Sequence, residues 1–151
     1  MISEPLKGEP LTILLVEDDA AHAELIARCF EQHQVANRLY HVSNGEDAMD
    51  FLYQRDRYAD VQCSPRPHLV LLDLRLPGTS GLEVLGFIKA DSGLRSIPVV
   101  VVTTSDEQAD MADAYQQHVN SYLVKPLSFD KFSQLMRDLG FYWLGWNRRP
   151  W

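Results

Sequence analysis

Three short apolar runs, each ending abruptly on polar side chains, constrain the fold of this chain more than any other feature. A strand that is apolar along its whole length is typically buried on both faces, as in a parallel sheet that helices cover on both sides. The runs cover residues 12–16, 69–72 and 98–102, and the polar groups that follow them begin at Glu17, Asp73 and Thr103.

Apolar residues recur at helical spacing after each of these runs, and two weaker strand patterns fit the same alternation. Asp19 is placed to cap the first predicted helix. Strict alternation of strands and helices predicts an α/β fold with a parallel sheet wrapped by helices on both faces. The polar stretch 55–68 is predicted to be a surface loop. The remaining predicted strands cover 39–42 and 122–124, and the predicted helices cover 20–30, 46–53, 82–88, 106–117 and 129–139.

Size, charge and cysteine usage limit the possible classes of protein. A length of 151 residues suits one domain, because single cores usually stop growing below about 250 residues. A formal net charge of -7 opposes binding to nucleic acid or to anionic lipid. The sequence has no run of about 18 apolar residues, so we expect no membrane span. Cys29 and Cys63 show no CxxC spacing, which favours a reduced, cytoplasmic location.

Reactive side chains stand at the carboxyl ends of four predicted strands. In doubly wound sheets, ligands bind beyond these ends, where the strand order reverses. Sheet geometry would therefore bring groups from separate parts of the sequence to one edge. Each group alone has a plain structural explanation, such as a turn cap or a surface lysine, but their convergence favours a functional site. The groups are Glu17, Asp18, Asp73, Thr103 and Lys125.

The chemistry of these groups indicates metal-assisted phosphoryl transfer. Carboxylates packed together repel one another, and a hard divalent cation such as Mg²⁺ stabilises such a cluster while also coordinating phosphate oxygens. Asp73 is a competent nucleophile, because a carboxylate can form an acyl phosphate. The Lys125 ammonium and the Thr103 hydroxyl can then interact with the phosphoryl oxygens. We therefore expect Mg²⁺ as the cofactor.

At these residues the sequence resembles the receiver domain family of two-component response regulators. The resemblance covers residues 11–140, which leaves 1–10 as an N-terminal extension and 141–151 as an aromatic C-terminal tail. It implies a flavodoxin-like, doubly wound five-stranded parallel sheet of order 2-1-3-4-5 with five helices. The matching motifs are ILLVEDD at 13–19, LVLLDLRLPG at 69–78, PVVVVTTS at 98–105 and YLVKPL at 122–127.

The resemblance also implies a role for each acidic residue. It makes Asp73 the phosphoacceptor and Asp18 a direct metal ligand. Glu17, where many family members carry aspartate, would be a ligand that acts mainly through water. The Arg75 backbone carbonyl would complete the protein ligands of Mg²⁺.

The same resemblance implies a conformational switch. Thr103 and Tyr122 match the pair that rearranges on phosphorylation, and Lys125 matches the lysine that senses the phosphoryl group. The family holds the peptide bond after this lysine in the cis form, so we expect a cis bond before Pro126. Tyr122 also has a structural interpretation, as a core aromatic whose hydroxyl is satisfied.

The implied function is that of a stand-alone response regulator, which accepts a phosphoryl group from a histidine kinase and is not otherwise an enzyme. A stand-alone receiver with an aromatic tail is similar to the response regulators that partner cyanobacterial phytochromes, so a phytochrome is one candidate donor. An aspartyl phosphatase is a competing hypothesis, but Leu74 and Arg75 follow Asp73 and no second acid stands two positions on. A receiver-shaped scaffold that is never phosphorylated is a third hypothesis, and the complete acid set argues against it.

The tail, FYWLGWNRRPW, holds five aromatic residues in eleven positions. It is either an extension folded onto its own domain or an interaction surface. The apolar period of the last helix breaks at Gly140, which leaves the tail without an obvious core to join. We therefore predict a homodimer that buries the tail. The predicted interface residues are Phe141, Tyr142, Trp143, Leu144 and Trp146.

Two other sets of residues are assigned to the fold and the surface. The histidines show no pair at metal-ligand spacing, and the last helix carries an apolar stripe that should face the core. The histidines are His22, His33, His41, His68 and His118, and the stripe comprises Phe129, Phe132, Leu135, Met136 and Leu139.

Overall fold

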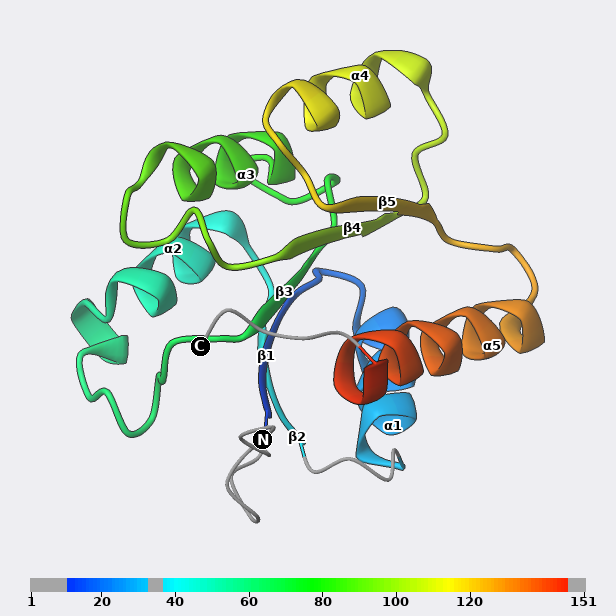
Figure 1. The fold of residues 1–151 in the computed structure, drawn as a ribbon, viewed down its shortest axis with the longest axis horizontal. Helices are drawn as coiled ribbons and strands as arrows, with labels where there is room; N and C mark the ends of the chain where they lie inside the picture. The colour runs from blue at the N-terminus through cyan, green and yellow to red at the C-terminus, as the bar shows by residue number, and fades with distance from the viewer. Residues whose placement is uncertain (1–10, 33–36, 147–151) are drawn as a thin grey trace.

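Five parallel strands form one sheet in the order β2-β1-β3-β4-β5 (Figure 1). The computed structural model describes residues 11–32 and 37–146. The strand order reverses at β1, because β2 lies on one side of it and β3 on the other. This arrangement confirms the predicted flavodoxin-like α/β fold. The strands are β1 (Leu11–Val16), β2 (Asn37–Val42), β3 (Leu69–Leu72), β4 (Val99–Thr103) and β5 (Ser121–Val124).

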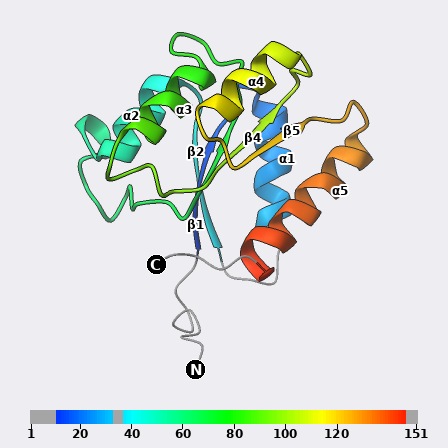
Figure 2. The same ribbon diagram turned by 45° about the horizontal axis from the view of Figure 1, so that its top comes forward.

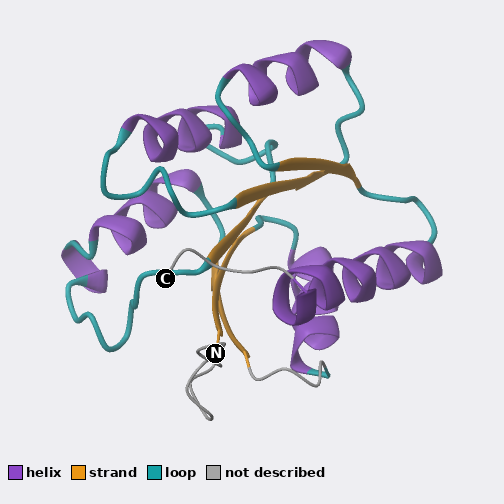
Figure 3. Ribbon diagram, in the orientation of Figure 1, coloured by secondary structure: helices purple, strands orange, loops and turns teal. Residues whose placement is uncertain are grey.

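Helices cover both faces of this sheet. Two of them, α1 and α5, lie on one face, and α2, α3 and α4 lie on the other (Figures 1 and 2). The strands therefore form a middle layer between two helical layers (Figure 3). Within the described residues, no helix combines the length and apolarity needed to cross a membrane. The helices are α1 (Ala20–Glu31), α2 (Gly45–Tyr53), α3 (Gly81–Ala90), α4 (Gln108–Gln116) and α5 (Phe129–Gly140).

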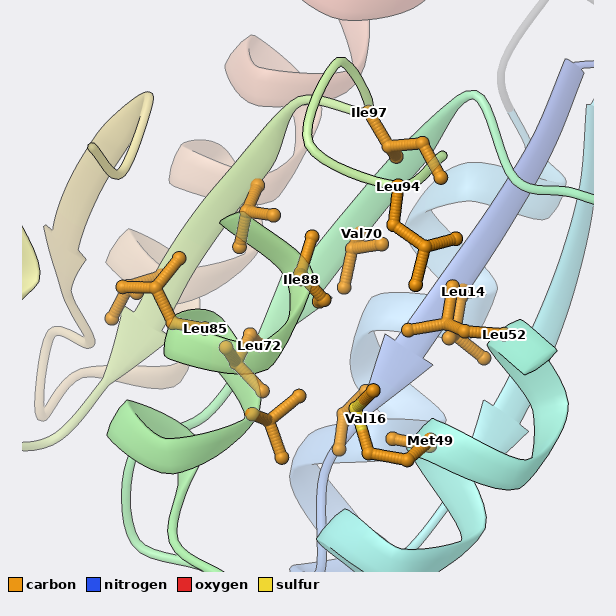
Figure 4. Close-up of a cluster of buried hydrophobic side chains, with 14 of the residues drawn as sticks. Leu14, Val16, Met49, Leu52, Val70, Leu72, Leu85, Ile88, Leu94 and Ile97 are labelled. Carbon is orange, nitrogen blue, oxygen red and sulfur yellow. The ribbon is translucent and has the colours of Figure 1, made fainter. Parts of the chain in front are cut away.

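The central strands are almost wholly apolar because successive residues pack into different layers. In β1, Ile13 and Leu15 join the cluster formed with α1 and α5. Leu14 and Val16 join the cluster formed with α2, α3 and α4, which Figure 4 shows. Strands β3 and β4 alternate in the same way. Burial on both faces leaves polar groups room only at the strand ends, where the candidate site lies.

Local hydrogen bonds set the ends of the elements. The Asp19 carboxylate accepts from the backbone N–H groups of Ala21 and His22, which confirms the predicted cap of α1. The loop 55–68 contains a short 3₁₀ turn at Asp56–Tyr58. The buried Ser64 hydroxyl donates to the Asp60 carbonyl at 2.8 Å and holds this loop together.

The helical backbone does not end at Gly140 but continues as a π-helical turn, Phe141–Trp146. A π-helix repeats at i→i+5, which places Leu144 on the same side as Leu139, and each of the two is 8% exposed. The prediction that Leu144 has no core to join is therefore wrong, and Trp143 also packs against the same cluster. The side chain of Trp146 and residues 147–151 lie outside the described residues.

Most of the predicted stripe on α5 faces the core. Phe132, Met136 and Leu139 are buried, and Leu135 is half-buried. Phe129 is 70% exposed, so its predicted place in the core is wrong. It is the first residue of α5 and precedes Phe132, the first buried residue of that helix.

Candidate functional site

The strand ends bring the predicted site residues to one edge of the sheet. Glu17 directly follows β1, Asp73 follows β3, and Lys125 follows β5. Thr103 is the last residue of β4 and is fully buried. Since all the strands are parallel, these carboxyl ends lie along the same edge.

The Lys125 ammonium links two buried acids across this edge. The side chain of Lys125 is 2% exposed, and its Nζ donates to Asp73 Oδ2 at 2.9 Å and to Glu17 Oε1. The third neighbour of Nζ is His22 Nδ1, at 3.0 Å. An ammonium has three donors and no acceptor, so these partners satisfy it completely.

Glu17, Asp18 and Asp73 each place one carboxylate oxygen within 4.8 Å of the others. Glu17 and Asp73 are buried, whereas Asp18 is exposed. Hard oxygen ligands with one side open to solvent fit Mg²⁺, which binds one or two carboxylates and keeps several waters. The role of the Arg75 carbonyl in such a site remains a prediction.

The two buried acids have opposite pKa shifts. Burial raises the pKa of Glu17 to about 7; the Lys125 hydrogen bond opposes this rise, and the charge of Asp73 reinforces it. Burial also acts to raise the pKa of Asp73, but the hydrogen bond and charge of Lys125 outweigh it and lower the pKa below its usual value. Asp73 is therefore the ionised member of the pair.

Backbone contacts fix the position of Asp73. The Arg75 N–H donates to Asp73 Oδ1 at 3.1 Å. Gly81, at the start of α3, lies so close that a Cβ there would be 2.2 Å from the Asp73 carbonyl oxygen. Gly81 was not predicted from the sequence, although it directly follows Ser80, the cap of α3.

Ser105 connects the two residues of the predicted switch. Its backbone N–H donates to Thr103 Oγ1 at 3.3 Å, and its carbonyl accepts from the Tyr122 hydroxyl at 2.9 Å. Burial raises the pKa of Tyr122, so the hydroxyl stays protonated and can donate. Ser105 was not predicted to matter, because its role depends on a contact between β5 and the loop after β4.

Comparison with known proteins identifies the family. Residues 13–137 match the response regulator receiver domain. This chain belongs to the receiver family. The acid cluster, the lysine and the predicted switch pair described above therefore lie in a receiver fold.

Two relatives show how closely this receiver matches known proteins. The probable methanogenesis regulatory protein FilR2 of Methanothrix harundinacea is 48% identical over 142 residues, which cover 94% of this chain and 89% of FilR2. Response regulator Rcp1 of Synechocystis sp. is 39% identical over 135 residues, which cover 89% of this chain and 90% of Rcp1.

Solved structures agree with these relationships. The Mn²⁺-bound form of Rcp1 has a TM-score of 0.90 at 38% identity and covers 94% of this chain and 100% of its own. The phosphorylated cyanobacterial phytochrome response regulator RcpA has a TM-score of 0.90 at 36% identity, with 95% and 100% covered. This receiver is thus related to phytochrome response regulators, and its acid cluster is consistent with divalent metal binding.

The Arg75 side chain of this receiver bridges two loops beside the site. Its guanidinium donates to Asp110 Oδ2 at 2.8 Å and to Ser105 Oγ at 3.3 Å. The Ser105 hydroxyl in turn donates to Asp110 at 2.5 Å. The loop after β3 is therefore tied to the start of α4, the side of the receiver where Tyr122 is held.

One expectation at this edge is wrong. No peptide bond is cis within 11–32 and 37–146, so the bond before Pro126 is not cis; trans is the generally favoured form by about 0.5–1 kcal/mol. His22, which we predicted to be a structural or surface residue, has a ring nitrogen in contact with Lys125. Its position in the first turn of α1, four residues after Asp18, is the sequence signal that could have predicted this contact.

Proposed function

We propose that this receiver accepts a phosphoryl group on Asp73 from a sensor histidine kinase, in a reaction that depends on Mg²⁺. Glu17, Asp18, Asp73 and the Arg75 carbonyl would hold the metal. The observation that carries the proposal is the buried contact between the Lys125 ammonium and the ionised Asp73. A carboxylate kept charged beside a fixed cation is prepared for attack on an anionic group.

In the proposed transfer, an Asp73 oxygen forms a bond to phosphorus as the bond from phosphorus to the donor's imidazole nitrogen breaks. The imidazole leaves with that electron pair, and Asp73 becomes an acyl phosphate. Lys125 then balances charge on the phosphoryl oxygens, and the Thr103 hydroxyl donates to one of them. When bound, Mg²⁺ supplies additional positive charge against the same oxygens.

The competing functions have less support. A phosphatase of the kind considered above needs a general acid near Asp73, but the residue two positions on is Arg75, which pairs with Asp110. A scaffold without phosphorylation does not require Lys125 to be buried against two carboxylates, which is costly without a function because of desolvation. We therefore favour a phosphoacceptor that carries a signal and has no substrate turnover of its own.

An exposed apolar rim beside Lys125 supports a protein as the phosphoryl donor. Leu127 is fully exposed, Phe129 is 70% exposed and Val124 is 40% exposed. Exposed apolar patches of this kind mark protein interfaces. A histidine kinase fits this rim, and a phytochrome is one candidate because RcpA is a phytochrome response regulator. We place the exchange in the cytoplasm, where such kinases obtain ATP.

Replacing both Leu127 and Phe129 with serine should lower phosphoryl transfer from the kinase about tenfold, the size expected for loss of interface anchors. Labelling by the small donor acetyl phosphate should not change, because the variant keeps Lys125 and Asp73. Initial rates with candidate kinases, phytochromes included, and labelled ATP test this. Val61→Ser, an exposed apolar residue in the loop 55–68, is the matched control. Equal losses with both donors would exclude a docking role, and labelling by acetyl phosphate but by none of the kinases would count against a kinase donor.

We also propose that Thr103 and Tyr122 form the two-state element that reports phosphorylation. The Thr103 hydroxyl is engaged by the N–H of Ser105, and Tyr122 is held by the carbonyl of the same residue. Drawing Thr103 toward a phosphoryl group would break the first bond and move Ser105. Tyr122 would then lose its partner, and the surface formed by α4, β5 and α5 would change.

A structure with the phosphoryl mimic beryllofluoride should show Thr103 turned toward Asp73 and the Tyr122 hydroxyl released from Ser105. Tyr122→Phe removes one neutral hydrogen bond of the inactive state, which is worth about 1 kcal/mol, so activation by the mimic should become roughly fivefold easier. Titration followed by NMR of the α4 amides measures this. Unmoved side chains in the complex, or an unchanged midpoint in the variant, would exclude this switch.

We further propose a homodimer that uses the exposed part of the tail. Phe141 is 59% exposed and Tyr142 is 54% exposed, and Tyr142 lines a groove of about 520 Å³ between β5 and α5. Burying two aromatics of about 150–250 Å² each would contribute several kcal/mol to association. Leu144 belongs to the core of each subunit, and a two-fold axis is the commonest arrangement.

Replacing Phe141 and Tyr142 with serine should convert the dimer to a monomer at tens of micromolar protein. Truncation after Gly140 is a poorer test, because it also removes Leu144 from the core. Light scattering after size exclusion measures the mass, and Phe87→Ser, an exposed phenylalanine on α3, is the control. A full-length protein that is monomeric, or a double variant that stays dimeric, would contradict the proposed interface.

A further inference from the structure

His22 touches the site from α1, a helix that supplies no residue to the proposed reaction. Its Nδ1 lies 3.0 Å from Lys125 Nζ, closer than it lies to the carboxylates of Glu17 (3.9 Å) and Asp19 (3.7 Å). Its ring packs edge-on against Phe132 of α5, with centroids 5.3 Å apart and an interplanar angle of 74°. The imidazole therefore lies between the two helices of one layer and points a nitrogen at the buried ammonium.

The contact has one chemically reasonable assignment. An ammonium can only donate, so Nδ1 must be the acceptor and the ring carries its proton on Nε2. The other two N–H groups of Lys125 go to Glu17 and Asp73. His22 is therefore the one acceptor of the three that is not a carboxyl group.

This difference matters because the two contacts with carboxyl groups are not permanent. Glu17 and Asp73 are proposed metal ligands, and Asp73 gains a phosphoryl group, so Lys125 must give up at least one of these contacts during the reaction. The contact with His22 can persist, since it lies outside the acid cluster. One fixed acceptor limits rotation about the Cε–Nζ bond and keeps a second N–H directed at Asp73.

We propose that His22 is a positioning residue that holds the Lys125 ammonium toward Asp73 while the carboxylate contacts change. This inference rests on the proposed phosphoryl transfer to Asp73. It assigns His22 no contact with the phosphoryl group, and its effect passes through Lys125 alone.

Two substitutions separate this role from simple packing. His22→Phe keeps a ring against Phe132 but removes the acceptor, whereas His22→Asn keeps an acceptor near the position of Nδ1 but loses the ring. We expect His22→Phe to lower the maximal rate of Asp73 phosphorylation by acetyl phosphate roughly tenfold, which is the effect of losing about one hydrogen bond to a charged group. His22→Asn should recover most of that loss, although it should be the less stable variant to heat.

Two further measurements show whether His22 acts through Lys125. In a Lys125→Met background, His22→Phe should have no additional effect on the rate. The affinity for Mg²⁺, measured by calorimetry, should be the same in the wild type and in His22→Phe. A wild-type rate in His22→Phe, a rate that follows thermal stability across the two variants, or independent effects in the double variant would overturn the proposal. If the wild type itself is not labelled, the proposed function fails instead.

Discussion

Replacing Asp73 with asparagine is expected to abolish acyl-phosphate formation and to leave the fold intact. The amide has nearly the same shape as the carboxylate, but it is not a nucleophile toward phosphorus. In the wild type, Lys125 Nζ donates a hydrogen bond to Asp73 Oδ2. The amide oxygen of the asparagine can accept the same hydrogen bond, so the ammonium keeps this partner. The expected loss of labelling is complete, whereas stability should change by no more than about 1 kcal/mol.

Labelling by acetyl phosphate and by kinases, followed by mass measurement of the intact protein, tests this prediction. Asp113→Asn, which makes the same chemical change at an exposed position of α4, is the control and should be labelled like the wild type. Circular dichroism during heating reports the fold of both variants. An Asp73→Asn protein that still gains a phosphoryl group would show that the acceptor lies elsewhere.

The layers of the fold were predictable because strands that are buried on both faces of the sheet appear in the sequence as continuous apolar runs. The central strands β1 and β3 are almost wholly apolar, and an acidic residue directly follows each of them. Both the strands and the sheet edge that carries Glu17 and Asp73 could therefore be predicted. The helices followed from a period near 3.6 residues, and Asp19 marked the start of α1. These signals are local, and they do not depend on which elements meet.

The features that were missed depend on tertiary contacts. Leu144 reaches the core because a π-turn changes the repeat of the helix from four residues to five, and a search at α-helical spacing cannot register this. Phe129 fits the apolar stripe of α5 but lies at its first residue, which is exposed. His22 acquires its role only from Lys125, more than a hundred residues away in the chain.

The second large effect concerns Mg²⁺, whose affinity should rise with pH and level off above about pH 7. Burial raises the pKa of Glu17 from 4.5 to about 7, so below that pH the metal must displace a proton. One displaced proton weakens the apparent affinity about tenfold for each pH unit below the pKa, so binding at pH 6 should be about tenfold weaker than at pH 8. Protons should be released on binding below pH 7.

The same pKa fixes the sign of the stability change without metal. Because folding raises the pKa of Glu17, the folded state binds this proton more tightly than the unfolded chain, and stability should fall as pH rises from 4.5 to about 7. The pKa of Asp73 is lowered by folding, so its ionised form stabilises the protein, and this stability is lost only as the pH falls below the usual aspartate pKa of 3.8. Added Mg²⁺ should therefore stabilise the protein most at and above neutral pH, where the site is deprotonated.

The variant Glu17→Gln tests whether Glu17 holds the proton that Mg²⁺ displaces. Glutamine cannot titrate, so the variant should bind Mg²⁺ more weakly at pH 8 but with an affinity that hardly changes down to pH 6. Calorimetry in two buffers of different ionisation enthalpy measures both the affinity and the protons released. Glu31→Gln, at the exposed end of α1, should keep the wild-type pH dependence. If the wild-type affinity does not change between pH 6 and pH 8, binding displaces no proton and the raised pKa of Glu17 is contradicted. If the pH dependence survives in Glu17→Gln, another acid of the cluster holds the displaced proton.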